Sequence, residues 1–188
     1  MPLHQSDHLS GRVAVFIDAA NMIYCHKDLG WKIDFKKVKK YFEEKCQLIG
    51  MYYYSAYLVE SIGQQSFFEM LSRKGFILRL KKLKRIAQSD GTFILKGNCD
   101  TDLVVDAVAR MAEYDSAVIM SGDSDFVSLV HLLKDRQKKV VVISTRWHIA
   151  HDLIQAADFY CDLKKFRLHW ERNVEKSEIT KSPFGLSG

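Results

Sequence analysis

Four short apolar runs, three of them with β-branched residues and none alternating with polar residues, constrain the fold of this chain more than any other feature. They span residues 12–17, 51–58, 116–120 and 140–144. Strands buried on both faces have this pattern, because helices cover both sides of their sheet. Segments with helical periodicity lie between the runs, at 34–47, 61–74, 101–113 and 124–134. The alternation predicts a three-layer α/β/α fold with a central, mainly parallel sheet and right-handed crossovers.

Weaker signals extend this pattern. Residues 76–83 predict a further strand, whose lysines and arginines indicate an edge position. Residues 87–92 (AQSDGT) are typical of a loop tip. A late helix at 149–157 and a short strand at 159–161 complete the predicted elements.

The chain length of 188 residues, 47% of them hydrophobic, suits one core. We expect a polar N-terminal segment at 1–11, one folded domain at 12–168 and a flexible C-terminal tail at 169–188, because the end of the chain is poor in apolar residues.

The cellular setting follows from what the chain lacks. No run approaches the length of a membrane span, and residues 1–11 have no apolar secretory core. The four cysteines lie far apart and form no CxxC pair, which argues against a zinc ribbon and against a disulfide framework. We therefore expect a cytoplasmic protein with reduced thiols and no membrane partner.

Aspartates recur where the predicted strands end. Asp18 directly follows the first run, and Asp123 and Asp125 follow the run at 116–120. Asp100 precedes a predicted helix. Ligands of an open parallel sheet bind outside the carboxyl ends of its strands, so we expect these carboxylates to meet at one edge.

Each acid also has a purely structural explanation, because Asp is a favoured helix cap. Asp18 fits that explanation least, since a carboxylate closing an apolar central strand is partly buried and must be compensated. One Mg2+ or Mn2+ ion would account for all the acids together, because hard cations prefer carboxylate oxygens. Asp102, Asp106 and Arg110 share a helical spacing, which favours a solvated face with an Asp106–Arg110 ion pair.

Three motifs resemble the signatures of NYN domains, in their bacterial LabA-like branch. They are VFIDAAN at 15–21, KGNCDTDLVVD at 96–106 and SGDSDF at 121–126. The segment AADFYCDL at 156–163 resembles the end of that domain. NYN domains are similar to PIN domains, so the resemblance implies a PIN-like fold, a metal-dependent acidic centre and ribonuclease activity.

The resemblance also implies which residues act. The expected catalytic and metal-binding residues are Asp18, Asp100, Asp123 and Asp125. We expect Asp125 to act through a water or a second ion and the other three to bind the metal directly. The acid follows Gly97 later than in many relatives, so Asp102 and Asp106 remain alternatives to Asp100 as the ligand.

A second set of residues is expected to bind RNA, in single-stranded or structured form. Asn21 would orient a phosphate or a metal-bound water. Ser121 and Ser124, with the backbone amides that open the following helix, would hold a phosphate or the attacking water. Lys96 would meet the scissile phosphate.

The net charge of +5 is modest, but its cations cluster between residues 73 and 85. Lys81, Lys82 and Arg85 in this run favour an electrostatic lane for an RNA backbone. The alternative is an edge strand that lysines protect from aggregation. Trp147 follows a predicted strand, where an aromatic residue packed in the fold is favoured over one that stacks a base.

A sheet of this kind also supports two other functions. A phosphatase with a nucleophilic aspartate would need an acid two residues after Asp18, where this chain has Ala20. The stronger alternative is a non-catalytic RNA- or protein-binding regulatory module of the same fold, acting as a homodimer or with a regulatory protein partner.

Overall fold

The structure, a computed structural model, describes residues 8–88 and 92–173. The strands of its central sheet are β1 (Arg12–Asp18), β2 (Gln47–Tyr57), β3 (Ile77–Lys82), β6 (Ser116–Met120), β7 (Lys139–Ser144) and β8 (Phe159–Asp162). Their order is β3-β2-β1-β6-β7-β8, and every neighbouring pair is parallel. Because β3 ends the sheet, its predicted edge position is confirmed.

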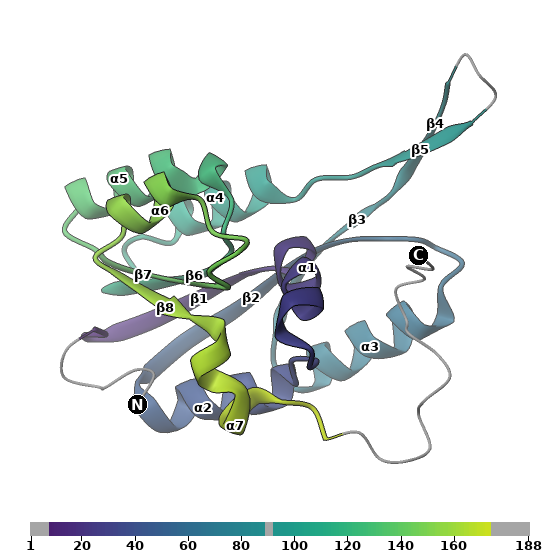
Figure 1. Cartoon of the computed structure of the whole chain (residues 1–188). Coiled ribbons are helices and arrows are strands. Elements are labelled where there is room, and N and C mark those ends of the chain that lie inside the picture. The colour runs from purple at the N-terminus through teal and green to yellow at the C-terminus, as the bar shows by residue number, and fades with distance from the viewer. Residues whose placement is uncertain (1–7, 89–91, 174–188) are drawn as a thin grey trace.

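Helices cover both faces of the sheet (Figure 1). On one face lie α1 (Ala19–Leu29), α2 (Phe35–Lys45), α3 (Ile62–Arg73) and α7 (Arg167–Trp170). On the other lie α4 (Asp100–Ala109), α5 (Val127–Asp135) and α6 (His151–Ala156). Short 3-10 turns, η1 (Ser124–Phe126) and η2 (Leu163–Phe166), precede α5 and α7. The predicted three-layer α/β/α architecture is confirmed. Within the described residues, no helix has both the length and the apolarity needed to cross a bilayer.

Strand β1 shows why its sequence does not alternate. Val13, Val15 and Ile17 point into the core beneath α1 and α2, whereas Ala14 and Phe16 point into the core beneath α4 and α5. All five side chains are fully buried. A central strand between two helical layers must be apolar on both faces.

Helix α1 was not predicted from the sequence. Its buried stripe is Ala19, Met22, Cys25 and Leu29, and it ends at Gly30, whose φ of 68° suits the left-handed cap position. Three of these four residues are small or unbranched, so the stripe was easy to overlook.

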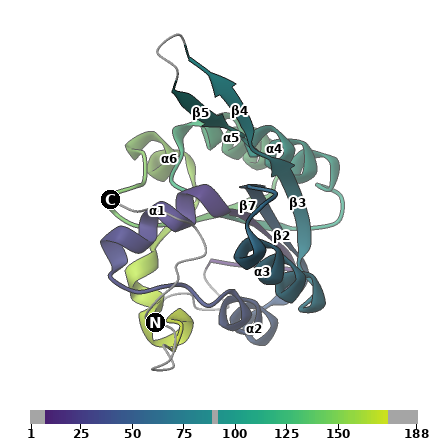
Figure 2. The same ribbon diagram turned by 90° about the vertical axis from the view of Figure 1, so that its right-hand side faces the viewer.

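A second unpredicted feature is an antiparallel hairpin formed by β4 (Lys84–Ala87) and β5 (Phe93–Lys96). It projects away from the body of the domain (Figure 2). The predicted loop tip lies between these two strands, and its residues 89–91 fall outside the described part.

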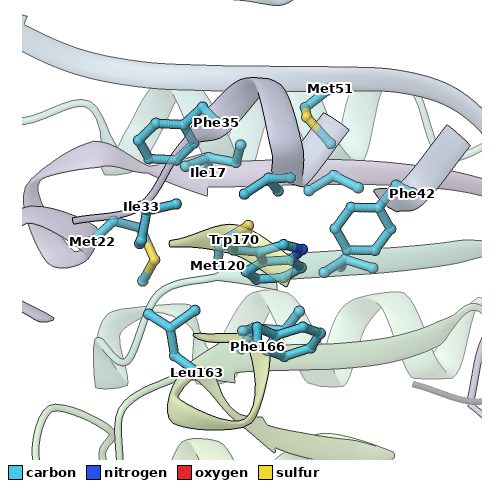
Figure 3. Close-up of a cluster of buried hydrophobic side chains, with 14 of the residues drawn as sticks. Ile17, Met22, Ile33, Phe35, Phe42, Met51, Met120, Leu163, Phe166 and Trp170 are labelled. Carbon is cyan, nitrogen blue, oxygen red and sulfur yellow. The ribbon is translucent and has the colours of Figure 1, made fainter. Parts of the chain in front are cut away.

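The packed structure extends past residue 168, where the sequence analysis ended the domain. Trp170 is fully buried, and its ring stacks on Phe166 with centroids 3.8 Å apart (Figure 3). Its carbonyl oxygen accepts a 2.8 Å hydrogen bond from the amide of Asp34. Leu9, in the expected polar N-terminal segment, is also buried. The remainder of the expected tail, residues 174–188, lies outside the described part.

Candidate metal centre

Three carboxylates converge at the carboxyl edge of the sheet. Asp100 opens α4, Asp123 follows β6, and Asp125 lies in η1. One oxygen from each lies within 4.8 Å of the others. Asp100 and Asp123 are half-buried and Asp125 is exposed. Like charges gathered this closely suit a hard divalent cation, which takes carboxylate oxygens as ligands.

Local hydrogen bonds hold the turn that carries two of these acids. The Oδ1 atom of Asp123 accepts a 3.0 Å hydrogen bond from the amide of Asp125. The amide of Asp123 donates to the hydroxyl oxygen of Ser121 at 3.2 Å. Asp123 is therefore a helix cap as well as a member of the cluster, so its structural and metal-binding interpretations are compatible.

Asp18 lies beneath this turn at the end of β1 and is only 8% exposed. Its Oδ2 atom accepts a 2.8 Å hydrogen bond from Ser121, and its Oδ1 atom accepts one of 3.2 Å from the amide of Asn21. Burial raises the pKa of Asp18 to about 6 despite these bonds, and repulsion from Asp100 and Asp123 adds to the rise. The site thus carries negative charge that the protein's own groups only partly compensate.

Asp100 experiences the same crowding. Burial raises its pKa, and the charges of Asp123 and Asp125 raise it further, against a lowering by Asn98. The amide of Asp100 donates to Asn98 Oδ1 at 2.6 Å, which shapes the start of α4. A bound cation would reverse this repulsion, because it stabilises the ionised form of each carboxylate.

Two residues that were expected to bind substrate also make hydrogen bonds that organise the site. Ser121 is fully buried, so its hydroxyl positions Asp18 and Asp123 and does not reach a phosphate. The amide oxygen of Asn21 accepts hydrogen bonds from the amide of Gly122 at 3.0 Å and from the hydroxyl of Ser144 at 3.4 Å. It joins the ends of β1, β6 and β7, a role that sequence spacing did not suggest. Ser124 is exposed beside the acids.

The predicted Asp106–Arg110 ion pair is wrong. Asp106 instead binds Arg79 through two hydrogen bonds of 2.7 and 3.2 Å and accepts a third, of 3.0 Å, from Tyr54. Burial works against ionisation, but the Arg79 and Tyr54 hydrogen bonds hold the pKa of Asp106 below its ordinary value. Arg110 pairs with Glu113. Asp106 thus fastens α4 to β3.

Asp102 likewise pairs with a cation and does not join the acidic cluster. Its carboxylate forms a 2.5 Å ion pair with Lys81, whose ammonium group donates to the carbonyl oxygen of Asn98 at 3.2 Å. Within the described residues, the group of acids close enough to share an ion contains Asp100 and neither Asp102 nor Asp106.

The cations of the expected basic lane fall into two groups, those that pair with acids of α4 and those exposed at the hairpin. Arg79 and Lys81 are held by acids of α4, as described above. Lys82 and Arg85 are exposed at the base of the hairpin. Lys96 pairs with Lys84 in the backbone register of the hairpin, and its side chain lies outside the described part.

Trp147 is not a packed aromatic, because its side chain is 73% exposed. It lies in the turn after β7, beside His148, whose Nε2 atom is 2.9 Å from the carboxylate of Asp28. Asp28 lies on α1, far from His148 in the chain, so no spacing along the sequence indicates this contact.

Comparison with known proteins identifies the family of this chain. The model of the NYN domain matches residues 12–164. The chain belongs to the NYN domain family. The low amplitude and bright protein LabA of Synechococcus elongatus is 32% identical over 176 residues, which cover 92% of this chain and 94% of that protein. The chain is thus a LabA-like NYN domain.

A solved structure supports the fold. The crystal structure of a protein of unknown function from Vibrio parahaemolyticus matches with a TM-score of 0.69 and 26% identity, covering 84% of this chain and 95% of that one. The six-stranded parallel sheet between two helical layers is the PIN-like fold. NYN domains with this fold are generally nucleases, and the acidic cluster lies where ligands of such sheets bind.

Proposed function

We propose that this NYN domain is a metal-dependent endoribonuclease that hydrolyses phosphodiester bonds in single-stranded or structured RNA. The observation that carries the proposal is the cluster of Asp100, Asp123 and Asp125, whose carboxylate oxygens lie within 4.8 Å of one another. A protein nucleophile is not needed, because a bound cation can activate water for phosphodiester hydrolysis.

The donor set fits Mg2+ or Mn2+. All its members are carboxylates, which these hard cations prefer, and the raised pKa values of Asp18 and Asp100 mark a deficit of positive charge. Asp100, Asp123 and Asp125 would hold the ion, and the more deeply buried Asp18 would support it from below. When bound, such an ion lowers the pKa of a coordinated water and neutralises charge on the phosphoryl oxygens.

The chain's own residues would position the RNA around this centre. Lys82 and Arg85 are exposed at the base of the hairpin and would attract the phosphate backbone. Ser124 is exposed next to Asp123 and would hold a phosphate oxygen. Lys96 and the side-chain amide nitrogen of Asn21 would make further contacts with the RNA. We propose that the domain acts in the cytoplasm.

One observation favours a non-catalytic regulator as the second candidate. Arg79 and Lys81, within the basic run, pair with Asp106 and Asp102, so the cationic lane is weaker than the sequence suggests. A regulator of this fold would bind RNA or a protein partner, as a homodimer or in a complex, without cutting.

A cleavage assay separates the two. Labelled single-stranded RNA is incubated with wild type, Asp100→Asn and Asp123→Asn in Mn2+ or Mg2+, with Asp152→Asn as a matched control whose side chain is 80% exposed on α6. We expect metal-dependent cleavage by the wild type and the control, and loss in both cluster variants. Cleavage that survives in both cluster variants, or its absence in wild type, would reject the ribonuclease. Binding without cleavage would support the regulator.

A further inference from the structure

The turn at residues 145–150, between β7 and α6, is bonded to the turn that carries two of the candidate metal ligands, Asp123 and Asp125. The amide of Ala150 donates a 2.8 Å hydrogen bond to the carbonyl oxygen of Gly122. A Cβ atom at Gly122 would collide with the carbonyl oxygen of His148, so the two backbones are in direct contact. Because Gly122 directly precedes Asp123, the position of the 145–150 turn is tied to that of the acidic cluster.

A second anchor ties the same turn to α1. Asp28 Oδ2 lies 2.9 Å from His148 Nε2 and accepts a 3.3 Å hydrogen bond from the hydroxyl of Thr145. Thr145 is fully buried. The amide of His148 also donates to the carbonyl oxygen of Thr145 at 3.1 Å. The turn is therefore held at both its ends and in its middle.

This fixed turn presents a large aromatic side chain to water. Trp147 is 73% exposed, whereas the chain's other tryptophans, Trp31 and Trp170, are 6% and 0% exposed. Its neighbour Arg146 is exposed as well. Tyr24, 54% exposed on α1, lies with its ring centroid 6.5 Å from that of His148. The Trp147 ring beside Arg146, on a turn held by hydrogen bonds, suits a ligand that has both a flat ring and a negative charge.

The order of the sheet places this surface relative to the other parts of the site. Strand β7 neighbours β6, which leads to Asp123 and Asp125, while β3 and the hairpin lie beyond β1 and β2 in the opposite direction. The acids thus lie between exposed cations on one side and Trp147 on the other. A nucleic-acid strand that crosses the acids from the hairpin would next reach Trp147.

We propose that Trp147 is a stacking platform for an unpaired base of RNA, with Arg146 contacting an adjacent phosphate. The inference rests on RNA as the substrate class of the proposed function, but it does not depend on cleavage. A tryptophan face accepts any base, so this subsite selects for single strands without selecting a sequence. Bases within a duplex are already stacked and cannot occupy it.

Intrinsic fluorescence tests this subsite directly, because Trp147 is the exposed tryptophan and the other two are buried. The probe is a single-stranded RNA of about ten nucleotides, within the usual site size of such surfaces, titrated into the full chain in EDTA so that no cleavage occurs. We expect the RNA to quench the emission. A duplex of the same sequence should quench much less.

Variants assign the effect to the residue. Trp147→Ala should lose the quenching and bind single-stranded RNA about 5- to 150-fold more weakly, the range for loss of one stacked base. Trp147→Tyr should keep most of the affinity. Leu168→Ala, which removes a side chain that is 95% exposed on α7, should bind like wild type. Circular dichroism checks that each variant is folded.

The outcomes separate this inference from the proposed function. Wild-type affinity in folded Trp147→Ala, or RNA that binds without quenching, would overturn the stacking site. A wild type that does not bind single-stranded RNA would overturn it too. Trp147-dependent binding without cleavage in Mn2+ supports the stacking site and rejects the ribonuclease. Cleavage by the wild type in Mn2+, together with unchanged RNA affinity in Trp147→Ala, supports the ribonuclease and rejects the stacking site.

Discussion

The hydroxyl of Ser121 donates a 2.8 Å hydrogen bond to the buried Oδ2 atom of Asp18, across 103 residues of sequence. The same hydroxyl oxygen accepts a hydrogen bond from the amide of Asp123. One buried side chain therefore sets the distance between the end of β1 and the turn after β6. The positions of Asp18 and Asp123 therefore both depend on Ser121.

Asp18 should make the metal-free protein less stable as the pH rises. Its pKa in the folded state is about 6, above the ordinary 3.8, so the folded state holds the proton more tightly than the unfolded chain. Stability should fall between about pH 4 and pH 6, by about 3 kcal/mol at most. Asp18→Asn should lack this loss. Urea unfolding in EDTA across this range measures the difference, and parallel pH profiles for the two proteins would refute it.

Ser121→Ala should destabilise the fold at neutral pH. It leaves Asp18 Oδ2 without its side-chain donor and so raises the pKa of Asp18 further. An unsatisfied buried acceptor costs about 1–3 kcal/mol, which chemical denaturation at pH 7 can measure. The exposed Ser124 offers a matched control, since Ser124→Ala should change stability by less than about 0.5 kcal/mol. Equal effects of the two substitutions would contradict the bridging role.

Asp106→Asn should weaken the fold and spare the metal site. The substitution removes the charge that Arg79 binds, at a cost of about 1–2 kcal/mol after allowance for solvent screening at this partly exposed pair. Mn2+ affinity, measured by isothermal titration calorimetry, should stay near that of wild type, whereas Asp100→Asn should bind Mn2+ at least about tenfold more weakly. A comparable loss of affinity in Asp106→Asn would restore Asp106 as a ligand.

Gly122→Ala should disrupt the contact between the turns at 121–123 and 145–150. The added methyl group meets the backbone of His148, which cannot rotate away as a side chain would. We expect a loss of about 3 kcal/mol or more in thermal or urea unfolding. Gly30→Ala is the comparison: it meets no atom within 4 Å, and its left-handed backbone alone should cost about 1–2 kcal/mol. A smaller loss at Gly122 than at Gly30 would show that the turns separate easily.

Ending the chain at residue 168 should destabilise the domain severely. The deletion removes Trp170, which packs among Phe42, Phe166 and Tyr41. Loss of a fully buried tryptophan costs about 3–5 kcal/mol. A chain ending at residue 173 keeps these contacts and should unfold like the full chain, as followed by circular dichroism. Equal melting temperatures for the two truncated chains would place the domain end at 168 after all.

Much of the fold followed from local patterns. The unbroken apolar run of β1 predicted a strand covered on both faces, and the alternation with helices predicted the parallel sheet. Helix α1 and the hairpin were missed. The stripe of α1 uses Ala19, Met22 and Cys25, which carry little helical signature, and the hairpin strands of 4 residues each are too short for periodicity to reveal.

The sequence by itself determined which acids reach one edge of the sheet, because parallel strands all end on the same side. Asp18 ends β1, and Asp123 and Asp125 lie just after β6. Only the tertiary structure decided which acids of α4 join them. Asp100 belongs to the cluster, whereas Asp106 binds Arg79, which lies on β3 and 27 residues away in the sequence. It also decided that Trp147 is exposed. Such pairings depend on how separate elements pack, and no spacing along the chain encodes them.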